Sequence, residues 1–177
     1  MQGNAGTGYG SQKSGLAGIH FQSVRFGTVS CNLSGFDSGE RAYSPAEVLP
    51  HLPFESVTHY QFVHFADMNQ QYPKIVAEAE AEWNRTVKEC SIPYFPHVSI
   101  GWDNTPRYST HTDSVVKGNT PEEFKKALAD AKAFSDQHNQ IPLITINSWN
   151  EWTETSYLQP DDRYGYGYLN AVKEVFG

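Results

Sequence analysis

The chain has 177 residues and a formal net charge of −7, from 13 basic and 20 acidic side chains. This length indicates one domain, and it excludes a complete (β/α)8 barrel, which typically needs about 250 residues. The negative field repels phosphate backbones, so no nucleic-acid partner is expected.

Residues 1–15 are rich in Gly, Asn and Ser and are predicted to be a flexible lead-in. A phosphate-binding glycine loop is the alternative, but no strand precedes it and no Lys-Ser or Lys-Thr pair follows at the required spacing. The start also lacks the apolar stretch of a signal peptide, and no apolar run approaches the roughly 18 residues of a membrane span. The localisation therefore stays open. Cys31 and Cys90 are interpreted as ordinary thiols.

Residues 16–177 are predicted to form one domain of alternating strands and helices. Leu16–Gln22 is a short strand candidate, followed by an irregular stretch over Ser23–Ser44 and a brief helical turn over Pro45–Leu49. The next strand is predicted over Ser56–Val63, which is rich in β-branched and aromatic residues.

A helix is predicted over Tyr72–Cys90, with Pro73 in its first turn. Apolar residues recur along it at three- and four-residue spacing, which gives one buried stripe. The stripe consists of Val76, Ala79, Trp83, Val87 and Cys90. Trp83 is therefore expected in the core rather than in a binding site.

A strand is predicted over Pro93–Ile100, and the clearest helix start follows it. Thr120 can cap this helix and Glu123 completes a capping box. The apolar face of the helix consists of Phe124, Leu128, Ala131 and Phe134. A further strand over Pro142–Asn147 and a last helix over about Tyr166–Phe176 complete an α/β order, which implies a parallel sheet.

Chemistry in such folds gathers beyond the carboxyl ends of the strands. His64 and Asp67 follow the strand at Ser56–Val63, and a surface loop is the favoured interpretation of both. Gly101–Arg107 and Trp149–Glu154 follow the next two strands, and these two segments hold three of the four tryptophans. An active face at this end of the sheet is therefore predicted.

Glu151 and Glu154 are the candidate catalytic residues. Two carboxylates brought together have pKa values that split, so that one can hold a proton while the other stays ionised. One acid and one base or nucleophile are what cleavage of a glycosidic bond needs. Trp149 and Trp152 beside them could stack on the apolar faces of sugars. The alternative is a buried indole beside a solvated carboxylate.

Trp102, Asp103 and Arg107 are candidate substrate-binding residues, because an indole can form a wall and the two charged side chains can bind sugar hydroxyls. The alternative is an Asp-Asn turn held by an Asp103–Arg107 ion pair. Four histidines are the remaining candidates for a metal, but their spacing matches no ligand signature, so no metal or cofactor is predicted. They are His59, His64, His97 and His111.

Three segments resemble the WbsX-like glycosyltransferase family, also described as glycoside hydrolase family 99-like. They are HVSIGWDNTPR (His97–Arg107), NTPEEF (Asn119–Phe124) and INSWNEWTETSYLQPDDRYGYGYL (Ile146–Leu169). The resemblance runs from about Gly35 to Gly177 and is sharpest from Pro93 onward. It implies that the chain is the C-terminal part of a (β/α)8 barrel, with about four βα units and a carbohydrate site.

The resemblance also implies roles for the glutamate pair. In similar family 99 hydrolases the pair lies in an NEWxE motif. By this resemblance, Glu154 would be the acid/base and Glu151 would deprotonate the sugar 2-hydroxyl, which attacks its own anomeric carbon. Asn150 of the same motif joins the predicted substrate-binding residues, with Trp149 and Trp152.

The sequence departs from the family pattern at two positions. Thr155 stands where Gly is usual, which matters if this position has a positive φ. Gln159 stands where Glu is usual and removes a charge near the site. Asp161, Arg163 and Gly165 keep family-like positions, and a structural pair of Arg163 with a neighbouring aspartate is favoured over a catalytic role.

Three functions follow as hypotheses. The first is a glycosidase-like enzyme that uses the glutamate pair on an oligo- or polysaccharide. The second is a glycosyltransferase in surface-polysaccharide (lipopolysaccharide O-antigen) biosynthesis, although no nucleotide fingerprint or DxD string is present. The third is a non-catalytic, truncated half-barrel. A half-barrel leaves sheet edges uncovered, so self-association or a missing N-terminal half is expected.

Overall fold

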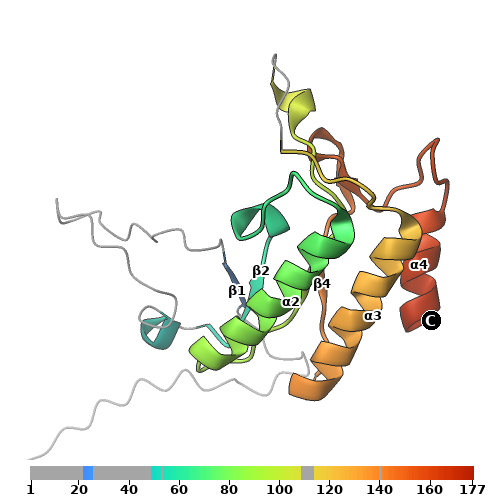
Figure 1. The fold of residues 1–177 in the computed structure, drawn as a ribbon. Coiled ribbons are helices and arrows are strands. Elements are labelled where there is room, and N and C mark those ends of the chain that lie inside the picture. Colours follow the sequence, from blue (N-terminus) through green and yellow to red (C-terminus); the bar gives the residue numbers. More distant parts are fainter. Residues whose placement is uncertain (1–21, 26–48, 53, 109–113, 140) are drawn as a thin grey trace, which may run out of the picture.

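The structure is a computed structural model that describes residues 22–25, 49–52, 54–108, 114–139 and 141–177. The predicted lead-in, most of the irregular stretch after it, Cys31 and His111 lie outside the described residues. Figure 1 shows the helices in front of a set of short strands.

Four parallel strands follow one another in chain order. They are β1 (Gln22–Arg25), β2 (Ser56–His59), β3 (His97–Ser99) and β4 (Thr145–Asn147). In β1 and β2, Gln22 lies opposite Ser56, and in β3 and β4, His97 lies opposite Thr145. Val57 joins the two pairs, because its N–H donates to the Pro93 carbonyl at 2.9 Å and its carbonyl accepts from the Phe95 N–H at 3.0 Å.

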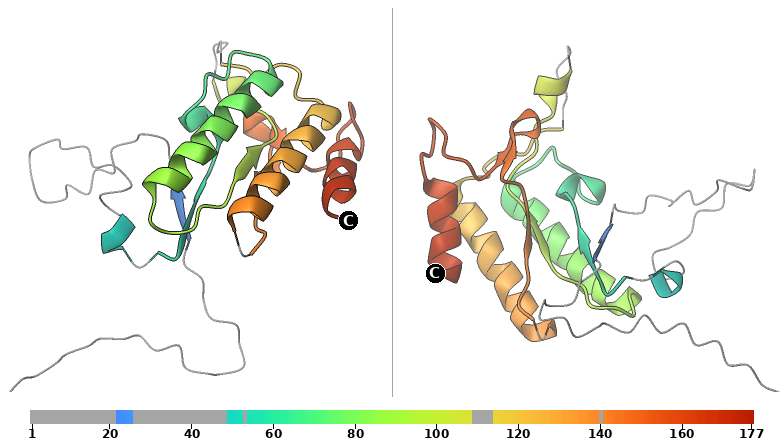
Figure 2. Two further views of the ribbon diagram at one scale, coloured as in Figure 1. Left: turned by 60° about the horizontal axis from the view of Figure 1, so that its bottom comes forward. Right: turned by 180° about the vertical axis from the view of Figure 1, so that it is seen from behind.

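Two helices cover one face of these strands, and a third packs beside the second of them, as the front view of Figure 1 and the rear view in Figure 2 both show. They are α2 (Tyr72–Glu89), α3 (Pro121–His138) and α4 (Gly167–Phe176). The core lies between helices and strands and includes Val57, Val98, Ile75, Ala79, Trp83, Phe124, Leu128 and Ala131, each at most 1% exposed. The buried stripes predicted for α2 and α3 are confirmed, except that Val87 and Cys90 at the end of α2 are only half-buried.

The start of α3 is confirmed, but only half of its capping box forms. The Thr120 hydroxyl accepts from the Glu123 N–H at 3.4 Å, which is the first half. The Thr120 N–H donates instead to the Gly118 carbonyl at 2.9 Å, and the Glu123 carboxylate pairs with Lys126 at 2.6 Å. The second bond of a capping box, from the Thr120 N–H to the Glu123 carboxylate, therefore does not form, because both groups have other partners.

The strands are shorter than predicted, and the reason is local. The strand predicted over Ser56–Val63 ends at His59, because the Gln61 side chain accepts from the Phe62 N–H and starts the 3₁₀ turn η2 (Phe62–His64). Prolines delay the next two strands: a proline has no N–H to donate to a ladder, and each strand begins only after its prolines, at His97 and Thr145.

The first predicted elements are described only in part. Of the strand predicted over Leu16–Gln22, only Gln22 lies within the described residues, and it is the first residue of β1. Ser23–Arg25, predicted as irregular, are strand. Of the helical turn predicted over Pro45–Leu49, only Leu49 is described, as the first residue of the 3₁₀ turn η1 (Leu49–His51). The last helix is confirmed, with Tyr166 as its cap.

The segment after β4 contains an antiparallel hairpin that the sequence did not predict. Strand β5 (Asn150–Glu151) and strand β6 (Ser156–Tyr157) enclose the 3₁₀ turn η4 (Trp152–Glu154). The parallel strands in the described part of the chain form an open arrangement. Assignment of this arrangement to part of a (β/α)8 barrel stays a prediction.

Candidate functional site

The hairpin after β4 carries the predicted glutamate pair. Its register places Asn150 opposite Tyr157 and Glu151 opposite Ser156. Side chains fix the hairpin to the end of β4, since the Ser156 hydroxyl donates to the Asn147 carbonyl at 2.8 Å and the Ser148 hydroxyl to the Ser156 carbonyl at 2.9 Å. Both glutamates are thus held at the carboxyl end of the sheet.

The loop after β3 lies directly against this hairpin. The Asp103 N–H donates to the Glu154 carbonyl at 2.8 Å, and the Thr155 hydroxyl donates to the Asp103 carbonyl at 3.3 Å. Gly101 permits this approach, because a Cβ at this position would lie 2.8 Å from the Thr155 carbonyl oxygen. The two segments predicted to form an active face are therefore in contact.

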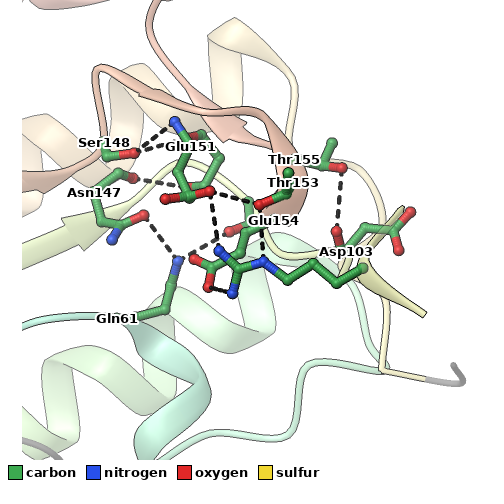
Figure 3. Close-up of polar contacts among 11 residues, drawn as sticks. Gln61, Asp103, Asn147, Ser148, Glu151, Thr153, Glu154 and Thr155 are labelled. Atoms are coloured by element: carbon green, nitrogen blue, oxygen red, sulfur yellow. Dashed lines mark hydrogen bonds and ion pairs between the residues drawn. The ribbon is translucent and has the colours of Figure 1, made fainter. Parts of the chain in front are cut away.

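Arg107 joins the two glutamates. It lies at the end of the 3₁₀ turn η3 (Thr105–Arg107), and its Nη1 donates to Oε1 of Glu154 at 2.6 Å. Its Nη2 donates to Oε1 of Glu151 at 3.0 Å, and its Nε donates to the Thr153 hydroxyl at 2.8 Å. Thr153 in turn donates to Oε1 of Glu151 at 2.7 Å (Figure 3).

The two carboxylates lie in different surroundings. The Glu154 side chain is 9% exposed, and its Oε2 is buried with no hydrogen-bond partner among the described residues. Burial raises the pKa of Glu154, against the lowering effect of Arg107, and the charge of Glu151 adds to the rise. The hydrogen bond from Thr153 lowers the pKa of Glu151, and the charge of Arg107 lowers it further. The pKa values of the two carboxyls are therefore shifted in opposite directions.

Asp103 and Arg107 do not form the ion pair that was the alternative for this loop. Oδ1 of Asp103 accepts from the Thr105 N–H at 2.9 Å, which makes the turn, while the guanidinium of Arg107 is directed to the glutamates. The sequence could not decide between these partners, because Asp103 is nearby in the chain and Glu154 is 47 residues away.

The tryptophans differ in their exposure. Trp149 and Trp152 are 53% and 46% exposed, as a sugar platform requires. Trp152 stacks on Tyr157 with ring centroids 3.8 Å apart, and its Nε1–H donates to Oε1 of Gln159 at 2.6 Å. Trp102 instead is partly buried and packs against the core, and Asn150 is exposed.

Gln61 is a residue of the site region that sequence reasoning missed. It is completely buried after the end of β2, and its Nε2 donates to Oδ1 of Asn147 at 3.1 Å and to the Gly101 carbonyl at 3.3 Å. The ends of three successive strands are thereby connected (Figure 3). The strand predicted over Ser56–Val63 included Gln61, and this concealed its position beyond the true end of β2 at His59.

Two of the histidines weighed as metal ligands have structural partners. Nδ1 of His59 lies 2.8 Å from the Tyr94 hydroxyl, and its Nε2 lies 3.3 Å from Glu82. The two ring nitrogens of His97 lie 2.9 Å from the hydroxyls of Thr145 and Ser99. Among the described residues, no group of three potential ligands gathers around a common point.

The positions that depart from the family pattern have clear local roles. Thr155 has φ 52°, so it stands in the left-handed conformation that its family glycine would adopt without strain. Gln159 holds the indole of Trp152. Further on, Oδ1 of Asp161 accepts from the Arg163 N–H at 3.0 Å, and the guanidinium of Arg163 lies 4.9 Å from the Tyr164 ring. Arg163 thus contacts Asp161 through its backbone N–H and Tyr164 through its guanidinium, and its structural role stays a prediction.

Comparison with known proteins defines the class. The family described as glycosyltransferase WbsX matches residues 10–172, which places the chain among domains of carbohydrate-active enzymes. The chain belongs to the WbsX glycosyltransferase family. The match begins upstream of Gly35, where the resemblance was expected to start, and inside the predicted lead-in.

Two relatives share a segment of 83 residues with this chain at 33% identity. Both are named uncharacterized protein WxcX and come from strains of Xanthomonas campestris pv. campestris. The shared segment is 46% of this chain but only 12% of each relative, so the chain spans a small part of their length. No solved structure matches the chain. In the described part of the chain, no helix is both long and apolar enough to cross a membrane.

Proposed function

We propose that this chain carries the acid–base site of an enzyme that cleaves glycosidic bonds, with Glu154 as acid/base and Glu151 as base. The observation that carries the proposal is the unequal pair. One guanidinium binds both carboxylates, yet Glu154 is buried, with one oxygen that has no partner among the described residues, and Glu151 is partly exposed. Two carboxyls with opposite pKa shifts are the requirement for this chemistry.

The proposed reaction has two steps, whose order comes from the family resemblance. In the first, Glu154 protonates the leaving oxygen while Glu151 takes the proton of the sugar 2-hydroxyl. The 2-oxygen attacks the anomeric carbon, the glycosidic bond breaks, and a 1,2-anhydro sugar forms. In the second, Glu154 takes a proton from water, which attacks the anomeric carbon. The bond between that carbon and the 2-oxygen breaks, and Glu151 returns its proton to the 2-oxygen. Both glutamates end in their starting states.

The substrate is proposed to be an oligo- or polysaccharide. Family membership supports a saccharide, and the exposed indoles of Trp149 and Trp152 support stacking on pyranose C–H faces. The architecture is proposed to be the C-terminal part of a (β/α)8 barrel. Parallel strands in chain order, helices on one face and a site at the carboxyl ends support that architecture.

The experiment is hydrolysis of a panel of activated aryl glycosides by the full chain. Glu154→Gln should lower turnover by roughly 10²-fold or more, because it removes the proton donor. Glu89→Gln is the matched control, since Glu89 also pairs with an arginine but lies on α2. Unchanged turnover in a folded Glu154→Gln variant would overturn the proposal.

Glycosyl transfer is the second candidate, and the family description favours it. An acceptor hydroxyl would then take the place of water, and the donor would be a nucleoside diphosphate sugar. Calorimetric titration with such a donor separates the two: saturable binding supports transfer, and no binding together with aryl glycoside turnover supports hydrolysis.

A further inference from the structure

The arginine between the glutamates has more contacts than a substrate-binding residue needs. All three donor nitrogens of its guanidinium are used, by Glu154, Glu151 and Thr153. Its backbone is also fixed, because the Arg107 N–H donates to the Asn104 carbonyl at 3.0 Å. The position of the guanidinium is thus determined by the protein's own contacts, which use one N–H on each of its three nitrogens.

We propose that Arg107 is a positioning residue that makes the two glutamates one asymmetric acid–base unit and directs the proton of Glu154 to its Oε2. The proposal deepens the proposed function and rests on it for its catalytic meaning. Its physical content, the order in which two carboxyls titrate, can be tested without any substrate.

The charge count supports this assignment. One guanidinium balances one ionised carboxylate, so a proton on the other leaves the three groups neutral together. Glu151 receives a second hydrogen bond, from Thr153, and its side chain is 35% exposed to water. Among the described residues, only Arg107 donates to the Glu154 carboxyl, and this side chain is 9% exposed, so it is the costlier of the two to ionise.

Geometry selects the oxygen as well as the residue. Oε1 of Glu154 accepts from Nη1 of Arg107, and an oxygen that accepts from a guanidinium is a poor site for a proton. Oε2 is buried and has no partner among the described residues. The proton therefore belongs on Oε2, and Arg107 anchors the opposite oxygen so that Oε2 keeps a fixed direction.

Other titratable groups near the pair are directed elsewhere. Asp103 turns its carboxylate to the Thr105 N–H, and the Tyr157 hydroxyl donates to Asp161 at 3.1 Å. Gln61 and Asn147, at the ends of β2 and β4, are neutral amides. Among the described residues, Arg107 and Glu151 are thus the charges that face Glu154.

The test is a titration of the full chain with ¹³C-labelled glutamate carboxyls, followed by NMR. Glu151→Gln and Glu154→Gln assign the two signals. In the wild type, Glu154 should titrate at higher pH than Glu151. In Arg107→Met both titrations should shift upward, because the cation that favours both ionised forms is lost.

Arg85→Met is the matched control. The Arg85 side chain is 41% exposed, as is that of Arg107, and it also binds two glutamates, Glu82 and Glu89, on α2. This variant should leave the Glu151 and Glu154 titrations where they are. Arg107→Lys keeps the positive charge but lacks the forked guanidinium that binds both carboxylates. The pKa of only one carboxyl should therefore shift. If Arg107→Met does not fold, the titration of Arg107→Lys tests the proposal in its place.

Three results would overturn the proposal: Glu151 titrating above Glu154 in the wild type, unchanged titrations in folded Arg107 variants, or an equal shift in Arg85→Met. Loss of turnover is not among the readouts. A failure of the proposed hydrolysis therefore appears in the Glu154→Gln kinetics, and a failure of this inference appears in the carboxyl titration.

Discussion

Thr155 shows at the scale of one residue how the site constrains the backbone. It stands at φ 52°, between a turn that carries Glu154 and a strand that continues the hairpin. A β-branched side chain in this conformation is strained, whereas glycine adopts it readily. The single compensation in the structure is a 3.3 Å hydrogen bond from its hydroxyl to the Asp103 carbonyl.

Thr155→Gly is therefore expected to stabilise the chain, by about 1 kcal/mol after the entropy that glycine adds to the unfolded state. Urea unfolding measures this. Thr155→Ala is the control, since it removes the hydroxyl but keeps a Cβ in the left-handed conformation. Equal or lower stability of the glycine variant relative to the alanine variant would contradict the explanation.

His97 predicts how stability depends on pH. Burial, together with the charges of His59 and His64, lowers its pKa to about 3. The folded state then binds fewer protons than the unfolded state below the ordinary pKa of about 6.5. The contribution of neutral His97 to the free energy of unfolding is complete above pH 6.5. It is lost as the pH falls toward 3, at roughly 1.4 kcal/mol per pH unit.

Urea unfolding between pH 7 and pH 5 measures how steeply the free energy of unfolding depends on pH. His97→Gln should flatten this dependence relative to the wild type, whatever the variant does to stability at pH 7. His138→Gln serves as comparison, because His138 lies at the exposed end of α3, and it should keep the wild-type slope. Identical slopes in all three proteins would contradict the assigned protonation state of His97.

At the scale of elements, the hairpin β5–β6 presents a prepared surface. Tyr157 covers one face of the Trp152 indole, and Gln159 holds its N–H, so the ring is fixed while nearly half of it stays exposed. A rigid ring loses little entropy when a ligand stacks on it. Gln159, which stands where the family has Glu, thus keeps an oxygen that accepts from the Trp152 N–H and lacks only the negative charge.

Tyr157→Leu is expected to weaken saccharide binding by roughly 2- to 10-fold, the value of one aromatic contact of about 0.5–1.5 kcal/mol. Calorimetry with an oligosaccharide from the turnover panel measures it. Tyr166→Leu is the control, because Tyr166 is 66% exposed and caps α4. If Tyr157→Leu binds as the wild type does, the hairpin has no platform role.

The prediction of elements succeeded where signals were local. The helices at α2 and α3 follow from apolar spacing and from Pro73, Thr120 and Pro121 at their starts. The strands were extended too far, because prolines and the Gln61 side chain end or delay them. The hairpin was missed, because its strands have two residues each and depend on Ser148 and Ser156 to fix them.

For the whole molecule, the open arrangement of strands leads to a prediction about assembly. In the described residues, β1 pairs only with β2 and β4 only with β3, so the outer edge of each has unpaired backbone groups. Parallel sheets are ordinarily covered on both faces, yet the described helices cover one. The isolated 177-residue chain is therefore expected to self-associate.

Sedimentation at several concentrations measures this, with calorimetry for the unfolding transition. We expect a concentration-dependent rise in mass or a weakly cooperative transition. A monomer at all concentrations with one sharp transition would contradict the half-barrel proposal, since such a chain needs no further strands.

The sequence by itself determined the family, the two long helices and the glutamate pair beside exposed indoles. These properties depend on motifs or on neighbours within about one helical turn. Only the tertiary structure decided that Arg107 binds Glu151 and Glu154 instead of Asp103, that Gln61 ties three strand ends, and that Glu154 is the buried member of the pair. The contacts of Arg107 with the pair join residues 44 and 47 positions apart, and they depend on how two loops meet at the end of a sheet.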